Sequence, residues 1–329
     1  MAGRRPVLTI PLADLARVSS VTTSPTNAEQ LEIVDRTLEK AMKGSTKWNV
    51  SRIPVLRGTF VRLLDRVDIP TKSTSSKPIL EIGSDGQLAS AKVLCALSGL
   101  EVVASNLTVG GFDKKVGDYA ITVKQNDIGV LDFPDDSFSM VYGRAVLEHI
   151  SDMDDFLVEC DRVLELGGVL YLDGGPLFYS PRGHHMAVKG PSGTHYGFDG
   201  MRDLLPHWCQ LESNEEEVFA HLTEVKGIDA ADARVVANYV FTSPEQNRMS
   251  ATMVMDTFAR SSFSNLKHEA THVKKIVPPP HLVEQYGEFD LTCNGLAYFG
   301  TSGPPEPVPA TPGRPLWRRI GSRIKRLLP

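Results

Sequence analysis

A regular alternation of short apolar runs and helical stretches, between Pro78 and Gly174, is the feature that most constrains this sequence. The strand-like runs are PILEIG, EVVASN, AITVKQND, SFSMVYG and GVLYLDG, and helices are predicted over 88–98 and 153–164. Strands that alternate with helices pair in parallel, because each helix carries the chain back across one face of the sheet. The sequence therefore predicts an α/β fold with a doubly wound sheet, in which ligands bind at the carboxyl ends of the strands.

Two amphipathic helices are predicted before this alternation, over 27–43 and 55–67, where apolar residues recur at helical spacing. The polar run 71–77 (TKSTSSK) then separates them from the first strand. We therefore predict an N-terminal helical extension over 1–76.

The main domain is predicted over 77–303, with an insertion late in it. Residues 176–265 break the alternation with a Gly, Pro and His-rich loop and several helical stretches. The runs His268–Val277 and Asp290–Phe299 then predict two strands that pair antiparallel at the edge of the sheet.

The end of the chain differs in composition from the rest. Residues 304–315 are rich in proline and predict a stiff, extended linker. Over 316–329 apolar residues recur at helical intervals, and every charged residue is basic although the whole chain has a formal net charge of -5. This pattern predicts an amphipathic helix, Leu316–Leu328, on an anionic membrane surface. A disordered basic tail and a helix docked on a protein are the alternatives.

Charge and cysteine usage limit the class of protein. The 35 basic and 40 acidic residues leave no global basic field, and no reading module is recognised, so no nucleic acid partner is predicted. The four cysteines are scattered, which favours a reducing compartment. No signal peptide or spanning segment is predicted either. We expect a cytoplasmic protein, peripheral on the inner face of the membrane if the tail binds lipid.

The end of the first strand carries the first chemical signal. Glu81 and Gly83 end the strand ILEIG, and Ser84, Asp85 and Gly86 lead into a helix. A glycine turn between strand and helix lets backbone amides approach a ligand, and an acid at the strand end accepts hydrogen bonds from an amino or hydroxyl group. A tight turn without any ligand is the alternative.

A second and longer signal runs from Asp127 to Gly175, DIGVLDFPDDSFSMVYGRAVLEHI followed by DDFLVECDRVLELGGVLYLDGG. Together with the first turn, these segments resemble the class I S-adenosylmethionine-dependent methyltransferases, in the subgroup that includes ubiquinone-biosynthesis-type enzymes. The resemblance implies a Rossmann-like, seven-stranded methyltransferase sheet with S-adenosylmethionine as cofactor. It covers Lys77–Gly175, and the closing strand pair matches the last two strands of that fold.

The resemblance also implies roles for individual residues. Glu81 matches the acid near the methionine amino group, and Asn106 stands where the family has an acid that binds the ribose hydroxyls. Asp127 matches the acid that contacts the adenine amino group. The remaining implied cofactor contacts are Gly83, Ser84, Gly86, Ile128, Gly143 and Arg144.

Three residues, in two places, depart from the family pattern. Asp85 and Gln87 stand where the second and third glycines of the turn are expected, and Gly86 is displaced by one position. Asn106 lacks the charge of the usual acid and therefore cannot form a charge-assisted pair with both hydroxyls. These departures keep open a non-catalytic methyltransferase-like protein that acts as a binding or scaffold partner.

Histidines are the candidates for accepting the proton of an oxygen or nitrogen nucleophile. His149 follows the fourth strand, and His184 and His185 follow the fifth, so both loops open at the carboxyl edge of the sheet. A helix-packing role for His149 is the alternative. His184 and His185 with His195 could also ligate a metal, but no carboxylate or cysteine falls at a tight spacing, so no metal is predicted.

The acceptor is the least determined part. The loop SPRGHH and the run PHWCQL resemble, more loosely, methyltransferases from bacterial surface-glycan gene clusters. We therefore predict a methyltransferase that acts on an oxygen of a glycan or lipid-linked acceptor. Aminopropyl transfer from a related cofactor ranks last, because no acidic amine-binding pocket is evident. Tyr196, Phe198 and Trp208 of the insertion are expected over the pocket or, alternatively, in a core.

Overall fold

The chain folds around a seven-stranded sheet in the order β3-β2-β1-β4-β5-β9-β8. The computed structural model describes residues 25–43, 52–107, 116–127, 130–198, 201 and 203–303. Five strands are parallel: β3 (Ile121–Gln125), β2 (Val102–Asn106), β1 (Ile79–Ile82), β4 (Phe138–Gly143) and β5 (Leu164–Gly174). Strand β9 (Leu296–Thr301) pairs antiparallel with β5 and with β8 (Ser264–Ala270). The predicted doubly wound fold, with its antiparallel closing pair, is confirmed.

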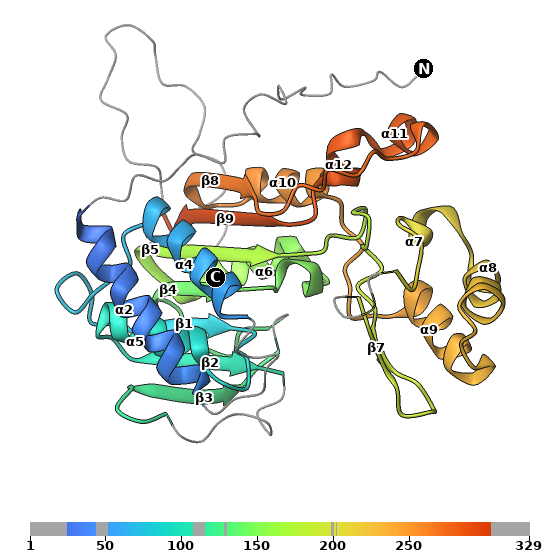
Figure 1. The fold of residues 1–329 in the computed structure, drawn as a ribbon. Helices are drawn as coiled ribbons and strands as arrows, with labels where there is room; N and C mark the ends of the chain where they lie inside the picture. Colours follow the sequence, from blue (N-terminus) through green and yellow to red (C-terminus); the bar gives the residue numbers. More distant parts are fainter. Residues whose placement is uncertain are drawn as a thin grey trace, which may run out of the picture.

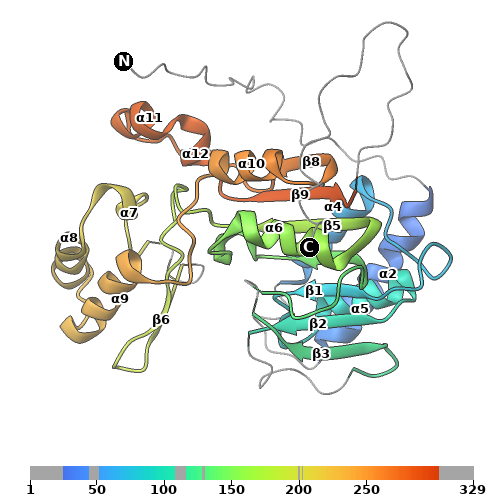
Figure 2. The same ribbon diagram turned by 180° about the vertical axis from the view of Figure 1, so that it is seen from behind.

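Helices cover both faces of this sheet. On one face lie α2 (Pro25–Met42), α4 (Ile53–Arg66) and α5 (Ala89–Ser98), and on the other α6 (Met153–Val163) and α10 (Ala251–Arg260) (Figures 1 and 2). Strands β1, β4 and β5 bury side chains on both faces, because a parallel sheet between two helix layers has no solvated side.

The two helices before the sheet are part of its helix layer. Their buried apolar residues belong to the same cluster as residues of α5, β1 and β4, and Phe60 of α4 stacks on Tyr142 of β4 at 5.9 Å between ring centroids. Arg62 of α4 also lies 3.6 Å from Asp173 at the end of β5. The N-terminal helices therefore pack against the sheet.

The insertion lies beyond the carboxyl ends of the parallel strands, toward which the strand arrows point in Figure 1. It contains a hairpin of β6 (Ala187–Lys189) and β7 (His195–Gly197), followed by helices. These helices are α7 (Cys209–Glu212), α8 (Glu215–Ala220), the π-helix η2 (His221–Val225) and α9 (Ala230–Thr242). The insertion has an apolar cluster of its own, which includes Met186, Tyr196, Leu222 and Val236.

The predicted bounds of the two closing strands are wrong. Within 268–277 only the first residues belong to β8, and 290–292 lie in helix α12 (Glu288–Thr292). Between the strands the chain forms α11 (Pro280–Tyr286), which begins with Pro280 because proline fits the first helical turn, where no amide donor is needed. Gly287, with φ +82°, separates α11 from α12. Strand β9 starts only at Leu296.

The predicted linker 304–315 and basic helix 316–329 lie outside the described residues. Within the part of the chain that the structure describes, no helix is long and apolar enough to cross a bilayer.

Candidate functional site

The end of β1 places an acidic side chain in a buried position. Glu81 is 4% exposed and accepts a hydrogen bond from the Ser84 hydroxyl. Burial raises its pKa to about 8, against the smaller opposing effects of Ser84 and of the positive charge on Arg144. Among the described residues no cation lies within salt-bridge distance of Glu81. The carboxylate therefore suits a cationic ligand that supplies the missing charge.

The glycine that follows is required by the backbone. Gly83 has φ +71°, and a Cβ atom there would lie 2.7 Å from Cγ1 of Val146. Only glycine fits this position without displacing Val146. The residue is exposed, so the turn presents bare backbone to a ligand at the end of β1.

The structure gives two of the departures from the family pattern, Asp85 and Asn106, a role in the turn. Asp85 accepts hydrogen bonds from the backbone amides of Gln87 and Ala89, at 3.0 and 3.3 Å, and so caps the start of α5. Asn106, at the end of β2, donates from Nδ2 to the carbonyl of Ser84 at 2.8 Å. The substituted residues stabilise the turn in which Ser84 and Gly86 lie.

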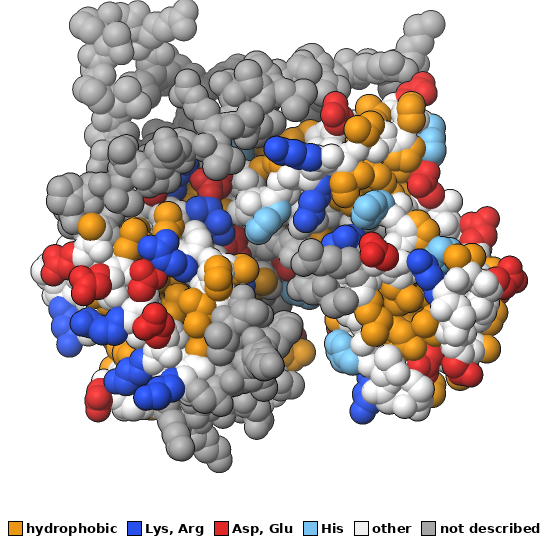
Figure 3. All heavy atoms as spheres, viewed as in Figure 1, with side chains coloured by type: hydrophobic (Ala, Val, Ile, Leu, Met, Phe, Trp, Pro, Cys, Tyr) orange, Lys and Arg blue, Asp and Glu red, His pale blue; other side chains and the backbone are white. Residues whose placement is uncertain are grey.

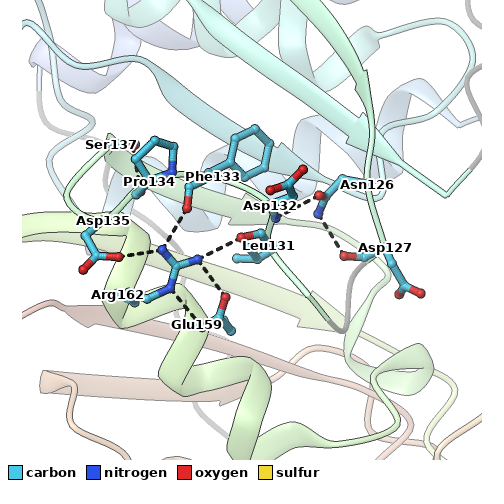
Figure 4. A network of polar contacts seen from close by, with 10 residues as sticks. All are labelled: Asn126, Asp127, Leu131, Asp132, Phe133, Pro134, Asp135, Ser137, Glu159 and Arg162. Carbon is cyan, nitrogen blue, oxygen red and sulfur yellow. Dashed lines mark hydrogen bonds and ion pairs between the residues drawn. The ribbon is translucent and has the colours of Figure 1, made fainter.

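The loop after β3 is held in place by an arginine of helix α6. Arg162 of α6 donates to the carbonyls of Leu131 and Phe133, each at 2.8 Å, and to Asp135 at 2.7 Å (Figure 4). It also pairs with Glu159, and these hydrogen bonds raise the pKa of Arg162. Arg162 thus joins the β3–β4 loop to α6. This contact gives a structural reason for the sequence pattern between Asp127 and Gly175 that resembles the methyltransferases.

Asp127 begins this loop and is exposed at the carboxyl end of β3. Its backbone carbonyl accepts a hydrogen bond from Nδ2 of Asn126 at 2.8 Å, while Oδ1 of Asn126 accepts from the amide of Asp132 (Figure 4). Asn126 thus orients the segment on both sides of its bend. The predicted contact Ile128 lies outside the described residues.

The end of β4 allows close approach as well. A Cβ atom on Gly143 would lie 2.8 Å from Val146 and 2.9 Å from Leu172. Arg144 follows, half-buried and near enough to act on the pKa of Glu81. The structure thus brings the predicted residues of β1 and β4 together at one edge of the sheet.

Two of the three candidate histidines meet at this edge. His149 ends the 3₁₀ turn η1 (Leu147–His149) after β4, and His185 lies in the loop after β5. Their rings form an edge-to-face pair with centroids 5.0 Å apart. Burial, and then the charge of His149, lower the pKa of His185 to about 3.

A third residue completes this cluster. The Glu148 carboxylate is 1% exposed, and its Oε1 lies 4.0 Å from Nε2 of His149 and 3.8 Å from Nε2 of His185. Burial raises the pKa of Glu148. We call Glu148, His149 and His185 the His–Glu cluster. Glu148 is not among the predicted site residues, although its place beside His149 in an apolar turn was a usable signal in the sequence.

His184 does not join the cluster. It is 4% exposed, and its Nδ1 accepts a hydrogen bond from the amide of Met186 at 3.2 Å. Burial and the neighbouring Arg182 lower its pKa to about 4. His195 is exposed on β7. The pairing of His184 with His185 as proton acceptors therefore finds no geometric support.

The insertion aromatics divide between core and site. Trp208 is 3% exposed and donates to the carbonyl of Leu291 at 3.2 Å, and the Tyr196 hydroxyl donates to Asp232 at 2.7 Å. Only Phe198 reaches the His–Glu cluster, with its ring centroid 4.5 Å from that of His185.

The insertion is also tied to the cluster by its last loop. The Nδ1 atom of His149 lies 2.6 Å from the carbonyl of Glu245. Asn247 donates from its amide to the carbonyl of Glu148 at 2.9 Å and from Nδ2 to that of Ile150 at 3.0 Å. The insertion and the carboxyl edge of the sheet therefore form one site.

Comparison with known proteins agrees with this architecture. Residues 80–172 match the family model described as a methyltransferase domain. No curated protein matches the chain. Among solved structures, an S-adenosylmethionine-dependent methyltransferase from Mesorhizobium loti is 14% identical, with 76% of this chain and 97% of that one covered and a TM-score of 0.42. Phosphoethanolamine N-methyltransferase 2 of Haemonchus contortus, in complex with S-adenosyl-L-methionine, is 13% identical, with 91% and 61% covered and a TM-score of 0.44.

At these identities and scores the two structures add nothing to the family match. That match bears out the predicted enzyme class, and the observed sheet order bears out the predicted fold. Residues 80–172 form the core of a methyltransferase domain.

Proposed function

We propose that this methyltransferase acts on an oxygen, a hydroxyl or carboxyl group of a glycan or lipid-linked acceptor. The observation that carries the proposal is the His–Glu cluster, which lies at the carboxyl ends of β4 and β5. An oxygen nucleophile must lose its proton as it takes the methyl group, and a hydroxyl needs a basic site to do so. The cluster offers such a site at the predicted methyl end of the cofactor.

The residues of the sheet edge would hold the cofactor. The buried Glu81 carboxylate suits the ammonium of the methionine part, and the exposed turn at Gly83 lets the backbone approach it. Oδ1 of Asn106 would accept a hydrogen bond from the ribose, because Nδ2 is engaged with Ser84. Asp127 would receive the adenine amino group. The other residues of this site are Ser84, Gly86, Ile128, Gly143 and Arg144.

When bound, the cofactor supplies a methyl group on a positively charged sulfur. The chain would hold the acceptor oxygen against this methyl group, and Nε2 of His149 would receive the proton of an acceptor hydroxyl. Since methyl transfer needs little acid catalysis, the chain contributes mainly orientation and proximity.

A hollow of about 620 Å³ beside the cluster supports an extended polar acceptor. It lies between the hairpin and α9 and is lined by Lys189, Arg234, Asn238, Tyr239 and Glu245, among others. Glu245 is the residue whose carbonyl meets His149. Arg234 is paired with Glu215 and Glu216, so Lys189 and Asn238 are the polar groups that would contact a sugar there. This hollow would receive the part of the acceptor remote from the reacting oxygen.

The proposal is tested with labelled S-adenosylmethionine and fractions of glycans and glycolipids. We expect methyl transfer to a hydroxyl or carboxyl oxygen, with at least a hundredfold loss in His149→Asn and unchanged transfer in the control His195→Ala. A product methylated on nitrogen or carbon would refute the proposal. Saturable cofactor binding without any turnover would favour the non-catalytic alternative.

The predicted association of Leu316–Leu328 with anionic lipid remains part of the proposal. It would bring the chain to the membrane surface on which a lipid-linked acceptor lies. Flotation of the full chain with vesicles of anionic and of neutral lipid tests it, and equal recovery with both kinds would refute it.

A further inference from the structure

We propose that the His–Glu cluster is a binding site for a divalent transition-metal ion, with Zn²⁺ as the best match. Its ligands would be Oε1 of Glu148 and Nε2 of both His149 and His185. Binding of the ion does not depend on the proposed function. The role of the ion in binding the acceptor oxygen, however, rests on the proposed function.

The spacing of the three atoms fits one small ion. The carboxylate oxygen lies 4.0 and 3.8 Å from the two imidazole nitrogens, and the three ligand atoms all lie within 4.8 Å of one another. Ligands bound to one zinc ion at about 2.1 Å stand roughly 3.5 Å apart. Shifts of a few tenths of an ångström would bring the carboxylate oxygen to this spacing from both nitrogens, and the two nitrogens would approach one another by at most about 1.3 Å. At the present distances the three atoms face one another without a hydrogen bond between them.

The hydrogen bond of His149 shows which ring nitrogen is available. Nδ1 lies 2.6 Å from the carbonyl of Glu245, and a carbonyl oxygen can only accept. Nδ1 therefore carries the proton, and Nε2 presents its lone pair toward Glu148. Imidazoles that ligate metals are held in this way, by a carbonyl or carboxylate on the opposite nitrogen. The ring of His185 is held between His149 and Phe198.

The buried carboxylate calls for a positive charge. Glu148 is 1% exposed, and Oε2 has no hydrogen-bond partner among the described residues. No lysine or arginine in the described part of the chain lies within salt-bridge distance of it. The backbone amides of Glu148 and Gly175 compensate this buried carboxylate only in part, since its pKa is still raised, whereas a bound metal ion would compensate its charge. Two neutral imidazoles and one carboxylate are a donor set that zinc accepts.

The site would keep one coordination position open. The side chains of His149 and His185 are 35% and 14% exposed, so the cluster opens on the side of the histidines. In the view of Figure 3 a gap separates the lower part of the sheet domain, on the left, from the insertion, on the right. Three protein ligands and an open position are typical of catalytic zinc sites. With the ion bound, the three ligand atoms would no longer receive the acceptor's proton as in the proposed function, and a hydroxyl in the open position would instead lose it to solvent, because the ion stabilises the oxyanion.

Metal binding is measured directly on the full chain, without cofactor or acceptor. After treatment with a chelator, the protein is titrated with Zn²⁺ and with Co²⁺, whose visible absorption bands report its coordination. We expect one ion per chain, cobalt bands typical of four or five ligands, and a loss of affinity of at least tenfold in each of Glu148→Gln, His149→Ala and His185→Ala. The control His195→Ala should bind like the unchanged protein.

Each outcome of the metal titration supports or overturns the proposed metal site. Circular dichroism shows which variants fold, and Glu148→Gln keeps the volume of the side chain if the histidine variants do not. Absence of binding by the folded chain at 100-fold excess of metal would overturn the proposal, as would binding that is equal in the cluster variants. A chain that binds the ion but transfers methyl groups equally with and without it would refute only the role in catalysis.

Discussion

Replacement of Glu81 by glutamine separates the stability of the fold from cofactor binding. Burial raises the pKa of this carboxyl group from an ordinary value of 4.5 to about 8. Between these values the folded chain holds a proton at Glu81 that the unfolded chain has released. The contribution of Glu81 to stability is therefore fully present below about pH 4.5 and is lost as the pH rises to about 8.

The size of this effect follows from the shift. Each pH unit between the two pKa values costs about 1.4 kcal/mol, so the wild-type chain should lose about 3 kcal/mol of unfolding free energy between pH 5 and pH 7 through Glu81 alone. Glutamine cannot titrate, yet its oxygen can still accept the hydrogen bond from Ser84. Glu81→Gln should therefore be more stable than the wild type at pH 7 and about equally stable at pH 5.

The assay is urea unfolding of both proteins at pH 5, 6, 7 and 8, with Glu284→Gln, a change of an exposed glutamate, as control. Other groups titrate alike in the two proteins and cancel in the difference. A difference in unfolding free energy that does not change with pH would refute the reasoning. Added S-adenosylmethionine should stabilise the wild type and have at least tenfold weaker affinity for Glu81→Gln, because the variant cannot offer a negative charge to the ammonium.

Three further changes test the rest of the cofactor site. Asp127→Ala should weaken S-adenosylmethionine binding in calorimetry by about tenfold with little change in stability, and an unaltered affinity would remove Asp127 from the site. Arg162→Lys should lower the unfolding free energy by about 1 to 3 kcal/mol in urea, because lysine cannot bond two carbonyls and two carboxylates at once, whereas the exposed Arg260→Lys should change it by less than about 0.5 kcal/mol. Gly83→Ala should destabilise the chain by about 1 to 3 kcal/mol through both its φ of +71° and the contact with Val146, and equal melting temperatures would contradict this.

The sheet was predictable because its strands are short, apolar and separated by helices with clear periodicity. The bounds of the two closing strands were harder to predict. The run 290–299 is apolar enough for a strand, yet its first residues form α12, because Gly287 and the packing of Leu291 against Trp208 favour a helix there. Local propensity does not contain such tertiary contacts.

The site was predictable in part for a similar reason. Glu81, Gly83 and Gly143 occupy strand ends, whose position in the fold follows from the order of the elements. The meeting of His149 with His185 depends on the course of the loop after β5, which no periodicity describes. The role of Glu148 depends on its burial, and burial of a charged residue in a turn becomes visible only when the surrounding elements are in place.

The way in which the insertion is joined to the sheet has a consequence for how such enzymes diversify. The insertion has an apolar cluster of its own, and at its far end Glu245 and Asn247 connect it to the η1 turn by a few hydrogen bonds to and from the backbone. Contacts of this kind depend little on side-chain identity elsewhere in the insertion. This unit can therefore be exchanged or reshaped in a lineage while the seven-stranded sheet is inherited unchanged.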